Sequence, residues 1–135
     1  MAGRFAMTGL GPSWLVVGVG GFTGSVARYL VAGAMERVFP GARVPMGTLV
    51  VNVLGCGLIG ALAALIEFRG VLGPQARLLL LVGVLGGFTT FSSFGYETLE
   101  LVRRGQFALG LANAGLQVLL GLTAVWLGHT AMRLL

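Results

Sequence analysis

Uncharged apolar stretches alternate with short charged segments along the chain. No charged residue occurs in residues 5–27, 44–66, 78–96 or 106–132. Each of these runs is close to or above the ~20 residues that span the hydrocarbon core of a bilayer. We therefore predict an all-α membrane protein, a single transmembrane domain over residues 1–135. Its four transmembrane helices are expected at about residues 14–35, 47–67, 78–102 and 107–132.

The third apolar run contains a sequence that is a poor helix interior. Residues Gly86 to Phe94 read Gly-Gly-Phe-Thr-Thr-Phe-Ser-Ser-Phe, so paired glycines precede two β-branched threonines. Glycine costs roughly 1 kcal/mol relative to alanine inside a helix, and threonine is restricted at χ1. The sequence therefore predicts a third helix broken mid-membrane. Such a break is tolerated where the freed backbone groups face protein, a cavity or an ion, and transport proteins bind ions at breaks of this kind.

The composition agrees with a protein embedded in lipid. Hydrophobic residues make up 56% of the chain, charged residues 10%, and the mean hydropathy is +0.95. These values are too apolar for an ordinary soluble domain. The lone cysteine, Cys56, offers neither a disulfide framework nor a metal site, so we interpret it as a small packing residue.

Arginines supply the whole positive charge of the chain. Nine basic residues, all arginine, stand against four acidic residues and give a net charge of +5. For a chain that is mostly membrane helix we expect the lipid bilayer, and no nucleic acid, as a partner. The two predicted sides carry Arg4, Arg69, Arg77 and Arg133 on one and Arg37, Arg43, Arg103 and Arg104 on the other. Because the sides nearly balance, the positive-inside rule leaves single and dual orientations both open.

Helical spacing places polar residues on single faces of the second and fourth helices. Thr48 and Asn52 are four residues apart, and so are Asn113 and Gln117. An asparagine in hydrocarbon either bonds to a neighbouring helix or donates its two N–H groups to a dehydrated anion in a pore. The sequence leaves both interpretations open.

Two phenylalanines and an arginine carry further candidate chemistry. Phe91 and Phe94 share a helical face, which usually indicates packing. Their positive ring edges could instead contact a small anion. Arg28 stands at the end of the first helix, where it either reaches the water interface or attracts anions into a vestibule.

The residue types that catalysis or proton coupling requires are scarce in the predicted spans. The sequence shows no Ser-His-Asp set, paired carboxylates or Cys/His cluster, so we predict that the protein is not an enzyme. A proton-coupled multidrug transporter needs a carboxylate near the middle of the bilayer, and only Glu97 approaches that depth. This transporter, and a non-transporting subunit of a larger complex, remain the alternatives.

Three motifs resemble the Fluc/CrcB family of bacterial fluoride channels. They are Gly24-Ser-Val-Ala-Arg28-Tyr29, Gly47-Thr-Leu-Val-Val-Asn52-Val-Leu-Gly55 and Gly86-Gly-Phe-Thr-Thr-Phe-Ser-Ser-Phe94. Each glycine motif alone is weak. The three in this order, with this length and hydropathy, are highly specific, and the resemblance covers nearly the whole chain.

The resemblance implies a function and an assembly. It implies a fluoride-selective channel that exports fluoride passively across the bacterial inner membrane and protects the cell against its toxicity. It also implies an antiparallel, dual-topology homodimer with two pores between the subunits. Fluoride and a second copy of this chain are the partners implied for this multi-pass inner-membrane protein.

Residue roles are implied in the same way. The family's pore asparagine falls on Asn52 and its pore phenylalanines fall on Phe91 and Phe94. Thr48 lies one turn from the asparagine, and Ser93 lies between the phenylalanines.

Further implied roles concern the vestibule, a sodium ion and the fourth helix. Arg28 matches the family's arginine at the end of the first helix, and a structural Na⁺ is implied at the dimer centre, held by the backbone carbonyls of Gly86 and Thr89 from each subunit. Where relatives commonly carry a tyrosine and then a serine, this chain carries Asn113 and Gln117. We expect both to line the pore and to alter rate and anion selectivity.

Overall fold

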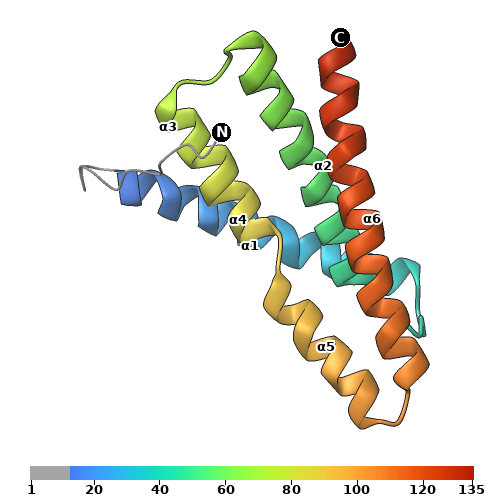
Figure 1. Ribbon diagram of the computed structural model, residues 1–135. Helices are drawn as coiled ribbons and strands as arrows, with labels where there is room; N and C mark the ends of the chain where they lie inside the picture. The colour runs from blue at the N-terminus through green and yellow to red at the C-terminus, as the bar shows by residue number, and fades with distance from the viewer. Residues whose placement is uncertain (1–12) are drawn as a thin grey trace.

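The computed structural model describes residues 13–135, so Arg4 and the part it plays in the charge balance lie outside the described residues. Helices follow one another through the described part of the chain (Figure 1). Their bounds are α1 Ser13–Val38, α2 Met46–Arg69, α3 Pro74–Arg77, the π-helix η1 Leu78–Leu85, α4 Gly86–Phe88, α5 Phe91–Arg103 and α6 Phe107–Leu134.

Four stretches within residues 13–135 are long and apolar enough to cross a membrane. They are Ser13–Val38, Met46–Arg69, Pro74–Arg103 and Phe107–Leu134. The predicted fold class, all-helical with four such spans, is confirmed. The third span begins earlier than the expected residue 78, because Pro74 occupies the first turn of α3, where its missing N–H costs nothing.

The third span changes its backbone geometry twice. The eight residues of η1 form a π-helix, a geometry that is rare and frequently found at functional sites. After α4, Thr89 and Thr90 are extended, with ψ of 157° and 117°. The predicted break in the third helix is therefore confirmed. Figure 1 shows it as the coil that joins α4 to α5.

Glycines bring α1 against the third span, backbone to backbone. A Cβ on Gly24 would overlap the carbonyl oxygen of Val84, and a Cβ on Gly20 would lie 2.6 Å from that of Leu79. A Cβ on Gly87 would overlap the carbonyl oxygen of Gly21, on α1, in the same way. Gly20 and Gly24 therefore let α1 contact η1 and α4 directly, immediately before the break.

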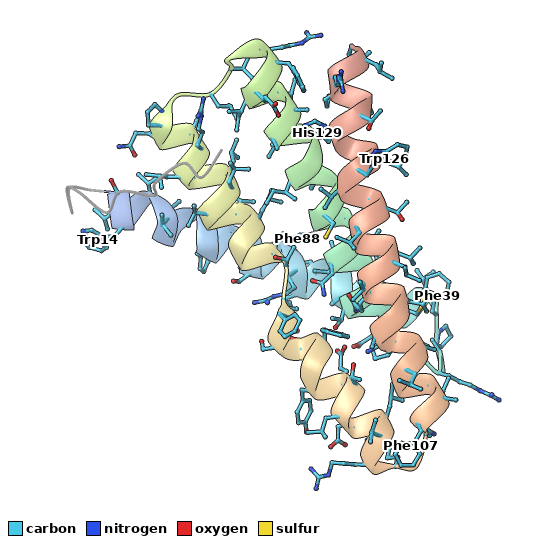
Figure 2. The ribbon with its side chains drawn as sticks, in the orientation of Figure 1. Trp14, Phe39, Phe88, Phe107, Trp126 and His129 are labelled. Atoms are coloured by element: carbon cyan, nitrogen blue, oxygen red, sulfur yellow. The ribbon has the colours of Figure 1, made fainter. Side chains whose placement is uncertain are left out.

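The helices α2 and α6 pack side by side along most of their length (Figure 1). Their contact also depends on glycine, since a Cβ on Gly60 or Gly128 would overlap the backbone of the facing helix. Phe88, the last residue of α4, is buried near the middle of the fold (Figure 2). The break thus lies beside the closely packed α2–α6 pair.

Candidate ion pathway at the helix break

The side-chain amide of Asn52, on α2, bonds to both backbone groups of Thr90. Its Oδ1 accepts the Thr90 N–H at 2.8 Å, and its Nδ2 donates to the Thr90 carbonyl at 3.0 Å. In a continuous helix this N–H would bond to the carbonyl of Gly86, four residues earlier. Asn52 therefore stabilises the broken backbone and releases the Gly86 carbonyl from that bond.

The two threonines complete the helix ends on either side of the break. Thr89 closes α4, because its N–H and its hydroxyl both donate to the Leu85 carbonyl at 3.0 Å. Thr90 is the N-cap of α5, since its Oγ1 accepts the Ser93 N–H at 3.2 Å. These capping roles were not predicted from the sequence, although threonine is a preferred N-cap residue.

Asn52 also connects the break to α6. Its Nδ2 donates a second hydrogen bond, at 3.0 Å, to Oε1 of Gln117. The Gln117 side chain is 8% exposed, and its Nε2 has no hydrogen-bond partner among the described residues. Of the two interpretations of Asn52, the structure shows hydrogen bonds to neighbouring segments of the chain. Its two N–H groups donate to the Thr90 carbonyl and to Gln117.

A cavity of about 380 Å³ lies beside the break. Its polar lining comes from Asn52, Thr89, Thr90 and Gln117, and its aromatic lining from Phe91 and Phe94. The two phenylalanine rings meet edge to face, with centroids 5.3 Å apart and planes at 68°. Phe91 is 82% exposed, so this face of the single chain is uncovered. The structure thus brings together most of the residues predicted for a pore.

A second cavity, of about 660 Å³, lies on the other side of the break. Arg28, Thr48 and Ser93 line it together with Glu97. Thr48 donates to the Glu97 carboxylate at 2.6 Å, and the Arg28 guanidinium is 3.4 Å from the Thr89 carbonyl. Thr90 lines both cavities, so the break forms part of the wall between them.

Asn113 lies apart from the other predicted pore residues. Its side chain is 0% exposed, and it is not among the residues that line the cavity beside the break. Its Nδ2 donates to the Thr98 hydroxyl at 2.9 Å, and that hydroxyl donates to the Phe94 carbonyl at 2.8 Å. Asn113 therefore holds α5 against α6 behind Phe94, instead of facing the cavity with Gln117.

Backbone carbonyls are the oxygen donors that the break offers to a cation. Within residues 13–135, no cluster of three His, Cys, Asp or Glu side chains could hold a metal ion. The Gly86 carbonyl is released from its helical donor, and among the residues that the structure describes the Thr89 carbonyl has only the long Arg28 contact, on one of its two lone pairs. Two such oxygens from one chain fit part of the coordination shell of a hard cation.

Comparison with known proteins identifies relatives over nearly the whole chain. The family model described as "CrcB-like protein, Camphor Resistance (CrcB)" matches residues 15–129. The chain is 53% identical over 121 residues to "Fluoride-specific ion channel FluC" of Solibacter usitatus, which covers 89% of this chain and 98% of that protein. It is 45% identical over 120 residues to the protein of the same name from Nitratidesulfovibrio vulgaris, covering 89% and 96%.

Proposed function

The chain belongs to the CrcB family, and on this premise we propose that it is a fluoride-selective channel that exports fluoride passively and protects the cell against it. One observation carries the proposal. The cavity beside the helix break joins the edge-to-face pair Phe91 and Phe94 to the amides of Asn52 and Gln117. The relatives named as fluoride channels support the choice of ion.

The lining of this cavity favours an anion. The edges of the Phe91 and Phe94 rings present positive partial charge, and so does the Gln117 amide nitrogen, which has no hydrogen-bond partner among the described residues. Among the described residues, no carboxylate lines the cavity, whereas a pathway for cations would require negative or carbonyl groups throughout. Donors and ring edges that closely match a small, strongly hydrated anion would select fluoride over larger halides.

Passive flow is sufficient for fluoride export. In acidic surroundings, fluoride enters cells as neutral hydrofluoric acid. The acid dissociates in the more neutral cytoplasm, where the anion is trapped. A membrane potential that is negative inside then drives the anion out through an open pore. The proposed channel requires no proton coupling, so Glu97, bonded to Thr48 in the other cavity, has no exchange role in it.

An antiparallel homodimer in the bacterial inner membrane is the assembly we propose. The cavity beside the break is bounded on one side by Phe91, which a single chain leaves 82% exposed, so a second copy would complete its wall. Arginines also occur at both ends of the α2–α6 pair. Arg69 is the last residue of α2 and Arg133 lies in the last turn of α6, whereas Arg43 precedes the start of α2 and Arg104 precedes the start of α6.

A structural Na⁺ at the dimer centre is part of this proposal. The carbonyls of Gly86 and Thr89 from each chain would supply four oxygens and hold the ion where the helix breaks. The ion would replace the helical hydrogen bonds that these carbonyls have lost, which is a structural role.

Fluoride efflux from liposomes that contain the purified protein tests the proposed function. A potassium gradient with valinomycin sets the voltage, a fluoride electrode records efflux, and chloride release is measured in parallel. Voltage-driven fluoride release without chloride release is the expected result. Proton-dependent uptake of aromatic cations that Glu97→Gln abolishes, with no fluoride release, would instead establish the transporter alternative.

A further inference from the structure

A further cavity, of about 720 Å³, lies between the loop that joins α1 to α2 and the turn that joins α5 to α6. The loop contributes Arg43 to its lining, and the turn contributes Arg104. Apolar side chains come from Leu101 on α5 and from Phe107 and Leu109 at the start of α6 (Figure 2). Neither arginine lines the two cavities beside the helix break. The cavity therefore combines two cationic side chains with an apolar floor, apart from the ion pathway.

The arginines give this cavity a net positive charge. Arg104 Nη2 is 3.4 Å from Oε2 of Glu100, and the other oxygen of the same carboxylate is 3.7 Å from Arg103 Nη1. One negative charge is thus shared by two guanidinium groups, and Arg43 forms no ion pair within residues 13–135. No carboxylate is among the described residues that line the cavity. Its charge is complementary to an anion.

The cavity lies where three of the four spans end. Arg104 directly follows the third span, Phe107 begins the fourth, and Arg43 precedes Met46, the first residue of the second span, by three positions. Lipid headgroups occupy this depth in a bilayer. A guanidinium group binds phosphate oxygens by charge-assisted hydrogen bonds, and basic pockets between transmembrane helices bind anionic headgroups. The apolar floor distinguishes a lipid from a free phosphate, because it offers a surface to acyl chains.

We propose that this cavity binds an anionic phospholipid, with the phosphate between Arg43 and Arg104 and the acyl chains against Leu101, Phe107 and Leu109. The inference is independent of the proposed function, because binding of the lipid is measured without fluoride. Zwitterionic phospholipids carry an ammonium group that the two arginines repel, so the cavity discriminates by the net charge of the headgroup.

Native mass spectrometry of the purified protein in detergent tests the proposal, with palmitoyl-oleoyl-phosphatidylglycerol as the anionic lipid and the phosphatidylcholine of the same chains as control. The protein should bind phosphatidylglycerol at lower concentration. Arg43→Gln and Arg104→Gln should each weaken its binding about fivefold, and the double variant about 25-fold, from the loss of one cation near the headgroup in each. Unchanged affinity in the double variant would overturn the proposal.

Arg103→Gln is the matched control for Arg104→Gln. Both arginines contact Glu100, and their side chains are 69% and 71% exposed, but Arg103 does not line the cavity. Arg103→Gln should therefore bind phosphatidylglycerol as wild type does. If Arg103→Gln and Arg104→Gln weaken binding equally, the attraction is that of diffuse surface charge, and the proposed site is refuted.

Two further measurements separate the lipid from other occupants of the cavity. Glycerol 3-phosphate has the phosphate but no acyl chains, so an excess of it should not displace phosphatidylglycerol. Equal competition would assign the cavity to soluble phosphate esters and overturn the proposal. Size-exclusion chromatography of the double variant should give the wild-type elution volume. Elution as a smaller assembly would show that the cavity binds a second copy of this chain instead of a lipid.

Discussion

Asn52 and Thr90, separated by 38 residues in sequence, form a closed pair of hydrogen bonds in the middle of the third span. The side-chain amide mimics the peptide group of a neighbouring strand and satisfies an N–H and a carbonyl that the helix break has exposed. Unpaired backbone groups at that depth are costly, because lipid offers no hydrogen-bond partners. This pair is one reason why an extended segment can persist inside a membrane helix.

Replacing Asn52 with leucine should destabilise the protein. The substitution keeps an apolar side chain of similar size and leaves the N–H and carbonyl of Thr90, which is 7% exposed, without partners. The expected loss is at least about 2 kcal/mol of unfolding free energy, from two buried unsatisfied groups. The midpoint of thermal unfolding in detergent measures it, with Gln75→Leu on the exposed surface of α3 as control. An unchanged midpoint in Asn52→Leu would contradict the role assigned to this pair.

Substituting either phenylalanine of the edge-to-face pair should abolish fluoride flux and preserve the fold. Phe91→Ile and Phe94→Ile remove the ring edges but keep apolar side chains, and Phe91 has few contacts within its own chain to lose. The liposome assay measures flux, and size-exclusion chromatography confirms that the protein is folded and assembled. Full flux in either variant would contradict the assignment of the pathway.

A single methyl group on Gly24 should separate α1 from the third span. The Cβ of Gly24→Ala would overlap the Val84 carbonyl oxygen and lie 2.8 Å from the Phe88 nitrogen, whereas a Cβ on Gly18 meets nothing within 4 Å. Overpacking of this kind costs about 1–3 kcal/mol. We expect the unfolding midpoint to be lower in Gly24→Ala and not to decrease in Gly18→Ala. Equal stability of the two variants would show that α1 can shift at no cost.

Hydropathy predicted the spans because charge-free runs must match the thickness of the bilayer. The break was also predictable from the local sequence, within residues 86–94, but which of these residues leave the helix was not. The glycines Gly86 and Gly87 stay helical, and Gly87 instead allows close contact with α1. The extended residues are the threonines that follow them. The π-helix before the break has no signature in the leucines, valines and one glycine from which it is built.

The candidate site was predictable only as a set of polar residues and two phenylalanines, without their arrangement. Asn113 and Gln117 have the same helical spacing as Thr48 and Asn52, yet Asn113 is enclosed by α5 while Gln117 lines the cavity. Spacing places residues on one face of a helix, but the neighbouring helix determines which part of that face is covered. For the same reason, the bond between Asn52 and Thr90 could not be derived from either motif alone.

Removing sodium should weaken the proposed dimer, because the carbonyls of Gly86 and Thr89 would lose the ion that replaces their helical hydrogen bonds. Backbone oxygens cannot be removed by mutation, so the test is to exchange Na⁺ for N-methyl-D-glucamine during purification. A site that is saturated at 100 times its Kd contributes about 2.7 kcal/mol, which should appear as a lower unfolding midpoint and as dissociation on size-exclusion chromatography. Adding back Na⁺ should restore both, and K⁺, a larger ion of the same charge, serves as the control for ionic strength. Equal stability in all three cations would mean that the released carbonyls are hydrogen-bonded within the protein. This result would contradict the proposed sodium site and would not affect the proposed anion pathway.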